Sequence, residues 1–138
     1  MFITQVSVFV ENDSGKLSEI TEVLAKSSID IRALSIADTS DFGILRLIVN
    51  EPHKAAEALR DAGITARETP VIAVRLEDTP GGLHSVLTMV DNVEYIYAFV
   101  SRSEKYAYVV IRCEDQDGAV ETLKKNNVKL MSNAELLV

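Results

Sequence analysis

The feature that most constrains the fold of this chain is an internal repeat. Gly15 and Leu17 recur 66 positions later as Gly81 and Leu83, where an alternating apolar run gives way to apolar residues at helical spacing. Further on the shift becomes 64, and three more segments match: residues 29–31 with 93–95, 43–45 with 107–109, and 55–59 with 119–123. The chain is therefore two copies of one unit of about 65 to 70 residues.

Each copy predicts the element order βαββαβ. In the first copy we expect strands near 2–10, 31–38, 42–49 and 64–67, and helices near 15–27 and 52–62. In the second copy we expect strands near 71–77, 94–101, 106–113 and 128–131, and helices near 81–91 and 116–126, with residues 134–138 ambiguous. Pro70 marks the seam without a Gly/Ser linker, which predicts domains 1–69 and 70–138. The predicted fold is α+β: two tandem ferredoxin-like units with antiparallel sheets and helices on one face.

Strand parity predicts which side chains lie under the helices. These are Val6, Val8, Val10, Leu45, Leu47 and Val49, then Ile72, Val74, Leu76, Val109, Ile111 and Cys113. The opposite face carries Phe9, Ile44, Ile48, Tyr95, Tyr97, Phe99, Tyr108 and Val110. An apolar face of this kind is usually covered, so we expect a homodimer, with face-to-face packing of the two copies as the alternative.

Composition narrows the function classes. A net charge of −7 provides no basic platform for nucleic acid or anionic lipid, and no apolar run is long enough to span a membrane. The single Cys113 and an N-terminus without the pattern of a signal peptide favour a cytoplasmic protein.

The turn at residues 77–83 joins a predicted strand to a predicted helix. Pro80 and two glycines permit a tight turn, and Asp78 or Thr79 is suited to cap the helix. Backbone N–H groups at a helix start bind anions, including the carboxylate of a small ligand. A well-capped helix start with no ligand is the plainer interpretation of the same residues.

Motif, repeat and element order together resemble the ACT domain, a regulatory module that binds amino acids in enzymes of amino-acid metabolism. The second copy carries the motif as Asp78-Thr79-Pro80-Gly81-Gly82-Leu83, and the first has Asn12-Asp13-Ser14-Gly15-Lys16-Leu17, with Ser14 in place of proline. The resemblance implies an allosteric amino-acid sensor, with a free amino acid as ligand and an enzyme of amino-acid metabolism as partner. It implies binding by these two turns, with Asp30 and Glu94 at the facing second-strand starts and His84 beside the second turn.

No residue pattern predicts catalysis, a metal site or a cofactor. His53 and His84 lie at separate helix starts, and Cys113 lies at a core-facing strand position. The main alternative is an RNA-recognition module, which shares the βαββαβ order and uses aromatic residues on its central strands. The aromatic positions of such a module are split between the copies here, and the negative charge opposes phosphate binding.

Overall fold

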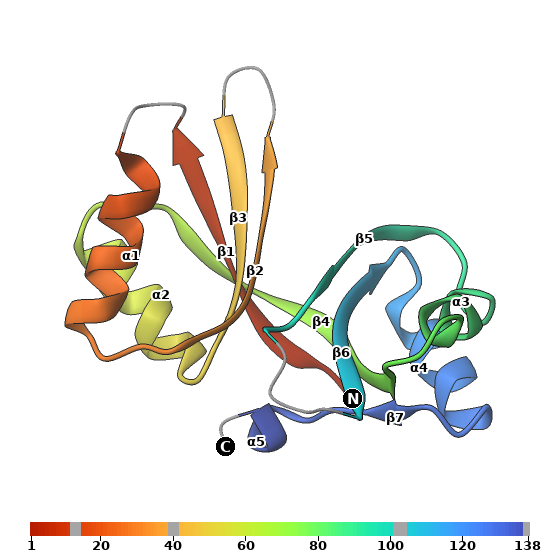
Figure 1. Cartoon of the computed structure of the whole chain (residues 1–138). Helices are drawn as coiled ribbons and strands as arrows, with labels where there is room; N and C mark the ends of the chain where they lie inside the picture. The colour runs from red at the N-terminus through yellow and green to blue at the C-terminus, as the bar shows by residue number, and fades with distance from the viewer. Residues whose placement is uncertain (12–14, 39–41, 101–104, 137–138) are drawn as a thin grey trace. The chain divides into compact units, whose positions relative to one another are not determined.

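The computed structural model describes residues 1–11, 15–38, 42–100 and 105–136. Its elements, labelled in Figure 1, are β1 (Ile3–Glu11), α1 (Lys16–Lys26), β2 (Ile31–Asp38), β3 (Phe42–Val49), α2 (Pro52–Asp61), β4 (Ala66–Glu77), α3 (Gly82–Leu87), β5 (Val93–Ala98), β6 (Tyr106–Cys113), α4 (Gln116–Lys125), β7 (Lys129–Leu130) and α5 (Asn133–Leu136). They form two compact units. We call residues 4–69 the N-terminal unit, and residues 1–3 together with 70–136 the C-terminal unit.

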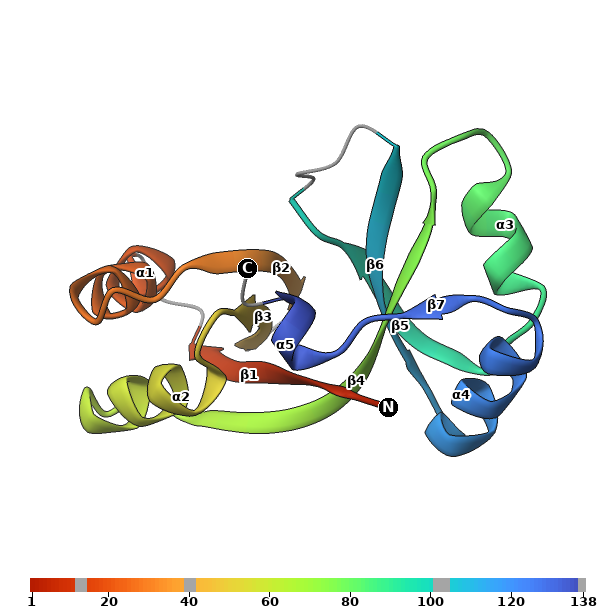
Figure 2. The same cartoon turned by 90° about the horizontal axis from the view of Figure 1, so that it is seen from below.

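The N-terminal unit is a sheet with two helices on one face. Its strands lie in the order β2-β3-β1-β4, with β1 and β2 each antiparallel to β3. Figures 1 and 2 show α1 and α2 on the same side of this sheet. Ile20 and Leu24 of α1 and Leu59 of α2 pack there against Val8 and Leu47, which fixes the side of each strand that faces the helices.

The C-terminal unit repeats this arrangement. Its strands lie in the order β5-β6-β4-β7, and α3 and α4 cover one face. The core joins Val86 of α3 and Leu123 of α4 to Val74 and Ile111 of the sheet, and Phe2 packs against it from the start of the chain. The fold class predicted from the repeat is confirmed.

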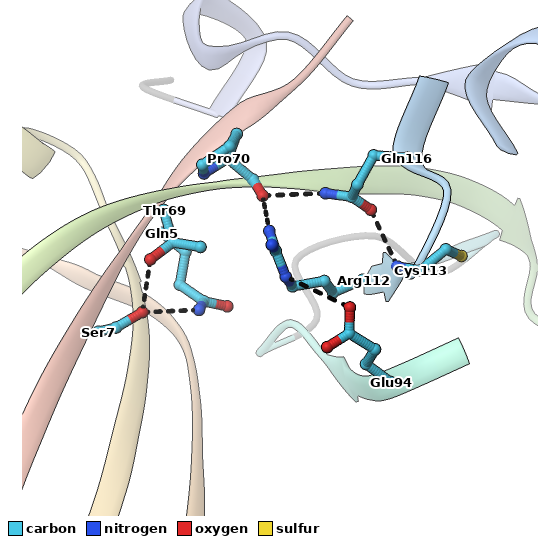
Figure 3. Close-up of polar contacts among 8 residues, drawn as sticks. All are labelled: Gln5, Ser7, Thr69, Pro70, Glu94, Arg112, Cys113 and Gln116. Atoms are coloured by element: carbon cyan, nitrogen blue, oxygen red, sulfur yellow. Dashed lines mark hydrogen bonds and ion pairs between the residues drawn. The ribbon is translucent and has the colours of Figure 1, made fainter. Parts of the chain in front are cut away.

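The strand β4 differs from the prediction of two separate strands at the seam. It continues from residue 66 to 77 through Pro70, whose missing N–H makes a break there the simpler expectation. Thr69 hydrogen-bonds to Ser7 of β1 (2.9 Å between hydroxyl oxygens), which ties this part of β4 to the N-terminal unit. In the C-terminal unit the Pro70 carbonyl accepts hydrogen bonds from Arg112 (2.7 Å) and Gln116 (3.0 Å), as Figure 3 shows. Tertiary partners thus hold the strand extended across the proline.

Three elements are shorter than predicted, among them β5, which ends at Ala98. Helix α3 ends at Leu87, although apolar residues continue to Val90. The Met89 N–H donates to Val86, three residues back, and Asn92 has a φ of 51°, so the last turn tightens and the chain reverses. The final strand is only Lys129–Leu130, and part of the ambiguous C-terminal segment is the short helix α5.

The predicted helix-facing residues all lie in or against the two cores. On the opposite face the outcome is mixed. Ile48, Tyr97 and Val110 are buried within the single chain, whereas Phe9 is 44% exposed. The apolar surface left open on this face is therefore smaller than the eight predicted side chains would make it.

Candidate functional site

The turn between β4 and α3 is closed by backbone groups. Gly81 begins the helix with a φ of 89°, and the Gly82 N–H donates to the Thr79 carbonyl (3.0 Å). A Cβ built on Gly82 would come closer than 3.0 Å to the backbone oxygen of Glu77. The predicted side-chain cap from Asp78 or Thr79 is not made, because the left-handed glycine occupies the N-cap position. This turn needs glycine at two successive positions.

Beside this turn the C-terminal unit has a pocket of about 550 Å³. It is an open surface pocket bordered by the end of β4, the turn, one side of α3, the start of β6 and the chain leading into β7. The lining consists of residues 75–77, 79–82, Ser85, Val86, Met89, Tyr106 and residues 127–129. Its volume lies within the range of about 300 to 1,000 Å³ that is usual for small-molecule sites.

Two cations and one acid lie in the wall of this pocket. The Arg75 guanidinium stacks over the Tyr106 ring, 4.2 Å from the ring centroid. The Lys129 ammonium pairs with Glu135 (3.3 Å), and Glu77 is exposed at the rim. The Ser132 backbone N–H, followed by the Lys129 ammonium, lowers the pKa of Glu135, so this pair is charged at neutral pH. The pocket lining combines apolar side chains with several groups that bind ions.

The N-terminal unit has a much smaller cavity at the matching position. Its volume is about 70 Å³, and its lining consists of residues 9–11, Lys16, Ile20 and residues 63–65. Each of these is the repeat partner of a residue lining the larger pocket. Phe9 stacks on Phe42 (4.5 Å between centroids), which corresponds to the stacking of Arg75 on Tyr106.

A comparison with known families identifies the repeat. The family model described as an ACT domain pair matches residues 1–138. This chain belongs to the ACT domain-pair family. The family predicted from the two turns and the element order is confirmed.

Solved structures share the fold of this chain. Protein BT0572 from Bacteroides thetaiotaomicron is 41% identical, with a TM-score of 0.91 over 99% of this chain and 96% of that chain. The ligand-free regulatory subunit of aspartate kinase from Thermus thermophilus is 19% identical, with a TM-score of 0.61. The Thermus flavus regulatory subunit is 20% identical, with a TM-score of 0.56; each covers 88% of this chain and 90% of its own. At these identities the Thermus structures show the fold alone. A comparison with curated proteins gives no match.

The predicted ligand residues of this ACT pair are only partly brought together. Thr79, Pro80, Gly81 and Gly82 line the larger pocket, whereas its lining does not include Asp78, Leu83 or His84. In the first turn Lys16 lines the small cavity, Gly15 has a φ of 85°, and Leu17 is 45% exposed. Asn12, Asp13 and Ser14 lie outside the described residues.

The two predicted second-strand acids each pair with an arginine. The Asp30 carboxylate lies 2.8 Å from Arg32 Nε, and the Glu94 carboxylate lies 3.9 Å from Arg112 Nε. Neither acid lines the pocket of its own unit.

The sequence motifs do not predict Arg75, Tyr106 and Lys129 as pocket residues. The available signal was the difference between the copies, since the partners of these residues are Phe9, Phe42 and Thr65. A charged or hydroxylated side chain that replaces an apolar or neutral one at a repeated position marks a change of local chemistry.

The remaining titratable candidates show no site chemistry. Cys113 is buried, and this burial, together with Glu94 and Asp115, raises the pKa of its thiol. His53 contacts Glu57 and Glu68, each at 3.3 Å, on the surface. In the part of the chain that the structure describes, no three His, Cys, Asp or Glu residues gather as a metal site. Over the same residues, no helix has the length and apolar character to cross a membrane.

Proposed function

We propose that this ACT domain pair is a regulatory protein that binds a free amino acid at its strand-to-helix turns and has no catalytic activity of its own. The observation that carries the proposal is the pocket of about 550 Å³ beside residues 79–82. Glycine at positions 81 and 82 lets the backbone pass close to a ligand. The Arg75 guanidinium in the same lining is suited to a ligand carboxylate.

The family and the fold support the regulatory part of the proposal. ACT domains bind amino acids, and two fold neighbours are regulatory subunits of aspartate kinase. By analogy, we propose that ligand binding here alters the activity of a separate enzyme of amino-acid metabolism. The family match favours this function over RNA recognition. The ligand roles of Asp30 and Glu94, and a location in the cytoplasm, stay predictions.

A thermal-shift screen of the twenty amino acids tests the binding. A ligand present at a hundred times its Kd stabilises the folded state by about 2.7 kcal/mol, enough for a clear rise in Tm. Ser85 lines the pocket from an exposed helical position, so Ser85→Phe should fill the pocket and abolish the shift.

Thr88→Phe is the matched control, because Thr88 is exposed near the end of the same helix and does not line the pocket. This variant should keep the ligand-induced shift. If no amino acid changes the Tm of the wild-type protein, the proposal fails.

We also propose that the chain forms a homodimer through the sheet face opposite the helices. Phe9 supports this proposal, since a phenyl ring that is 44% exposed gains by being covered. Sedimentation should give a mass near twice the chain mass of 15.2 kDa. Phe9→Asp should then reduce the mass to that of a monomer without loss of circular dichroism. A wild-type mass near 15.2 kDa would contradict the proposal.

A further inference from the structure

The two copies of the ligand pocket have diverged in size. The cavity is about 550 Å³ in the C-terminal unit and about 70 Å³ in the N-terminal unit, although both are lined from corresponding positions. A cavity of 70 Å³ is well below the range of about 300 to 1,000 Å³ for small-molecule sites. Of these two corresponding cavities, as the described residues line them, the C-terminal one alone has room for a ligand of ordinary size.

Two substitutions change the side chains at corresponding positions of the two linings. Where the C-terminal unit has Gly82, the N-terminal unit has Lys16, a long side chain that lines the small cavity and reaches Glu19 (3.5 Å). Where the C-terminal unit has Arg75, the N-terminal unit has Phe9, a lining residue whose ring stacks on Phe42. The two linings therefore differ in side-chain size and chemistry at these positions.

The two cavities also differ in the charged side chains that line them. Glu11 and Glu77 are repeat partners, so each cavity has one acid at its rim. The C-terminal pocket adds Arg75 and Lys129, which replace an aromatic ring and the neutral Thr65. Its lining therefore holds two cations and one acid.

Arg75 is the cation best placed for an incoming anion. One face of its guanidinium lies on the Tyr106 ring, and none of the carboxylates in the described residues pairs with it. The planar edge of an arginine held in this way matches a carboxylate, which it can bind through two parallel hydrogen bonds. Lys129 already shares its charge with Glu135, so it is the weaker of the two cations.

We infer that, given the proposed amino-acid-binding function on which this step rests, only the C-terminal pocket binds a ligand, and that this ligand is an acidic amino acid. Its two carboxylates and one ammonium match the two cations and one acid of the lining. Arg75 holds one carboxylate, Lys129 supports the other, and Glu77 receives the ammonium. A neutral amino acid leaves one cation unmatched.

Calorimetric titration of the full chain with L-aspartate, L-glutamate, L-asparagine and L-glutamine tests the inference. One acidic ligand should bind per chain, at least tenfold more tightly than its amide. Arg75→Gln should weaken acidic-ligand binding at least tenfold and reduce the preference over the amide. Arg67→Gln removes the same charge from an exposed residue of the same strand outside both cavities, and should bind like the wild type.

The outcomes separate this inference from the proposed function. Two ligands per chain, or equal affinity for acid and amide, overturn the inference while amino-acid binding stands. If none of the twenty amino acids binds, the proposed function fails and the inference fails with it. If Arg75→Gln does not fold, the Lys129→Gln variant provides a second test of the charge match. It should also weaken acidic-ligand binding, and unchanged affinity in a folded Lys129→Gln protein counts against the charge match.

Discussion

Replacement of Gly82 by alanine should destabilise the C-terminal unit, because the turn has no space for a side chain there. The added Cβ would meet the Glu77 carbonyl oxygen closer than 3.0 Å, with Leu76 Cδ1 at 3.5 Å behind it. The nearest atom belongs to the backbone, so a change of rotamer cannot relieve the contact. The turn must open, which strains or breaks the hydrogen bond from Gly82 to Thr79 (3.0 Å).

The size of the effect follows from these two terms. Overpacking costs about 1 to 3 kcal/mol, and a lost hydrogen bond about 1 kcal/mol more. We expect a free energy of unfolding lower by about 2 to 4 kcal/mol, and a Tm lower by roughly 5 to 15 °C for a chain of this length. Gly81→Ala acts differently, since the space beside Gly81 is open and the cost is the left-handed conformation, about 1 to 2 kcal/mol.

Urea unfolding followed by circular dichroism measures these differences, with Lys16→Ala as the control. Lys16 is the repeat partner of Gly82, and it tolerates a full side chain at the same point of its own turn. Lys16→Ala should change stability by no more than about 0.5 kcal/mol. If Gly82→Ala unfolds at the same urea concentration as Lys16→Ala, the reasoning from close backbone approach is wrong.

Two further predictions concern the cores. Leu59 and Leu123 are repeat partners with no exposed surface. Leu59→Ala and Leu123→Ala should each lower the free energy of unfolding, measured in urea, by about 2 to 5 kcal/mol. A loss below about 1 kcal/mol for either variant would contradict its core position. The Cys113 thiol should react slowly with a disulfide reagent at pH 8 in the native protein and at once in urea, and rapid labelling of the native protein would contradict this. Because burial raises the pKa of this thiol in the folded state, its contribution to stability is complete below the ordinary thiol pKa of about 8.5 and is lost as the pH rises through the folded value.

The sequence alone determined the features that depend on local pattern. The shift of 66 and then 64 positions revealed two copies, and alternation along each strand placed Val8 and Leu47 under the helices. The glycines at 81 and 82 located the turn beside the larger pocket. These inferences succeeded because periodicity and turn chemistry are properties of neighbouring residues.

Tertiary structure decided the features that depend on distant partners. Pro70 lies within one continuous strand, where its carbonyl is bound by Arg112 and Gln116 from more than forty positions away. Arg75 became a pocket residue because Tyr106 holds its guanidinium and Lys129 lies beside it in the sheet. The volumes of the two cavities depend on how side chains from several elements fill one space. No local pattern encodes that volume, because packing is settled only when all of those elements meet.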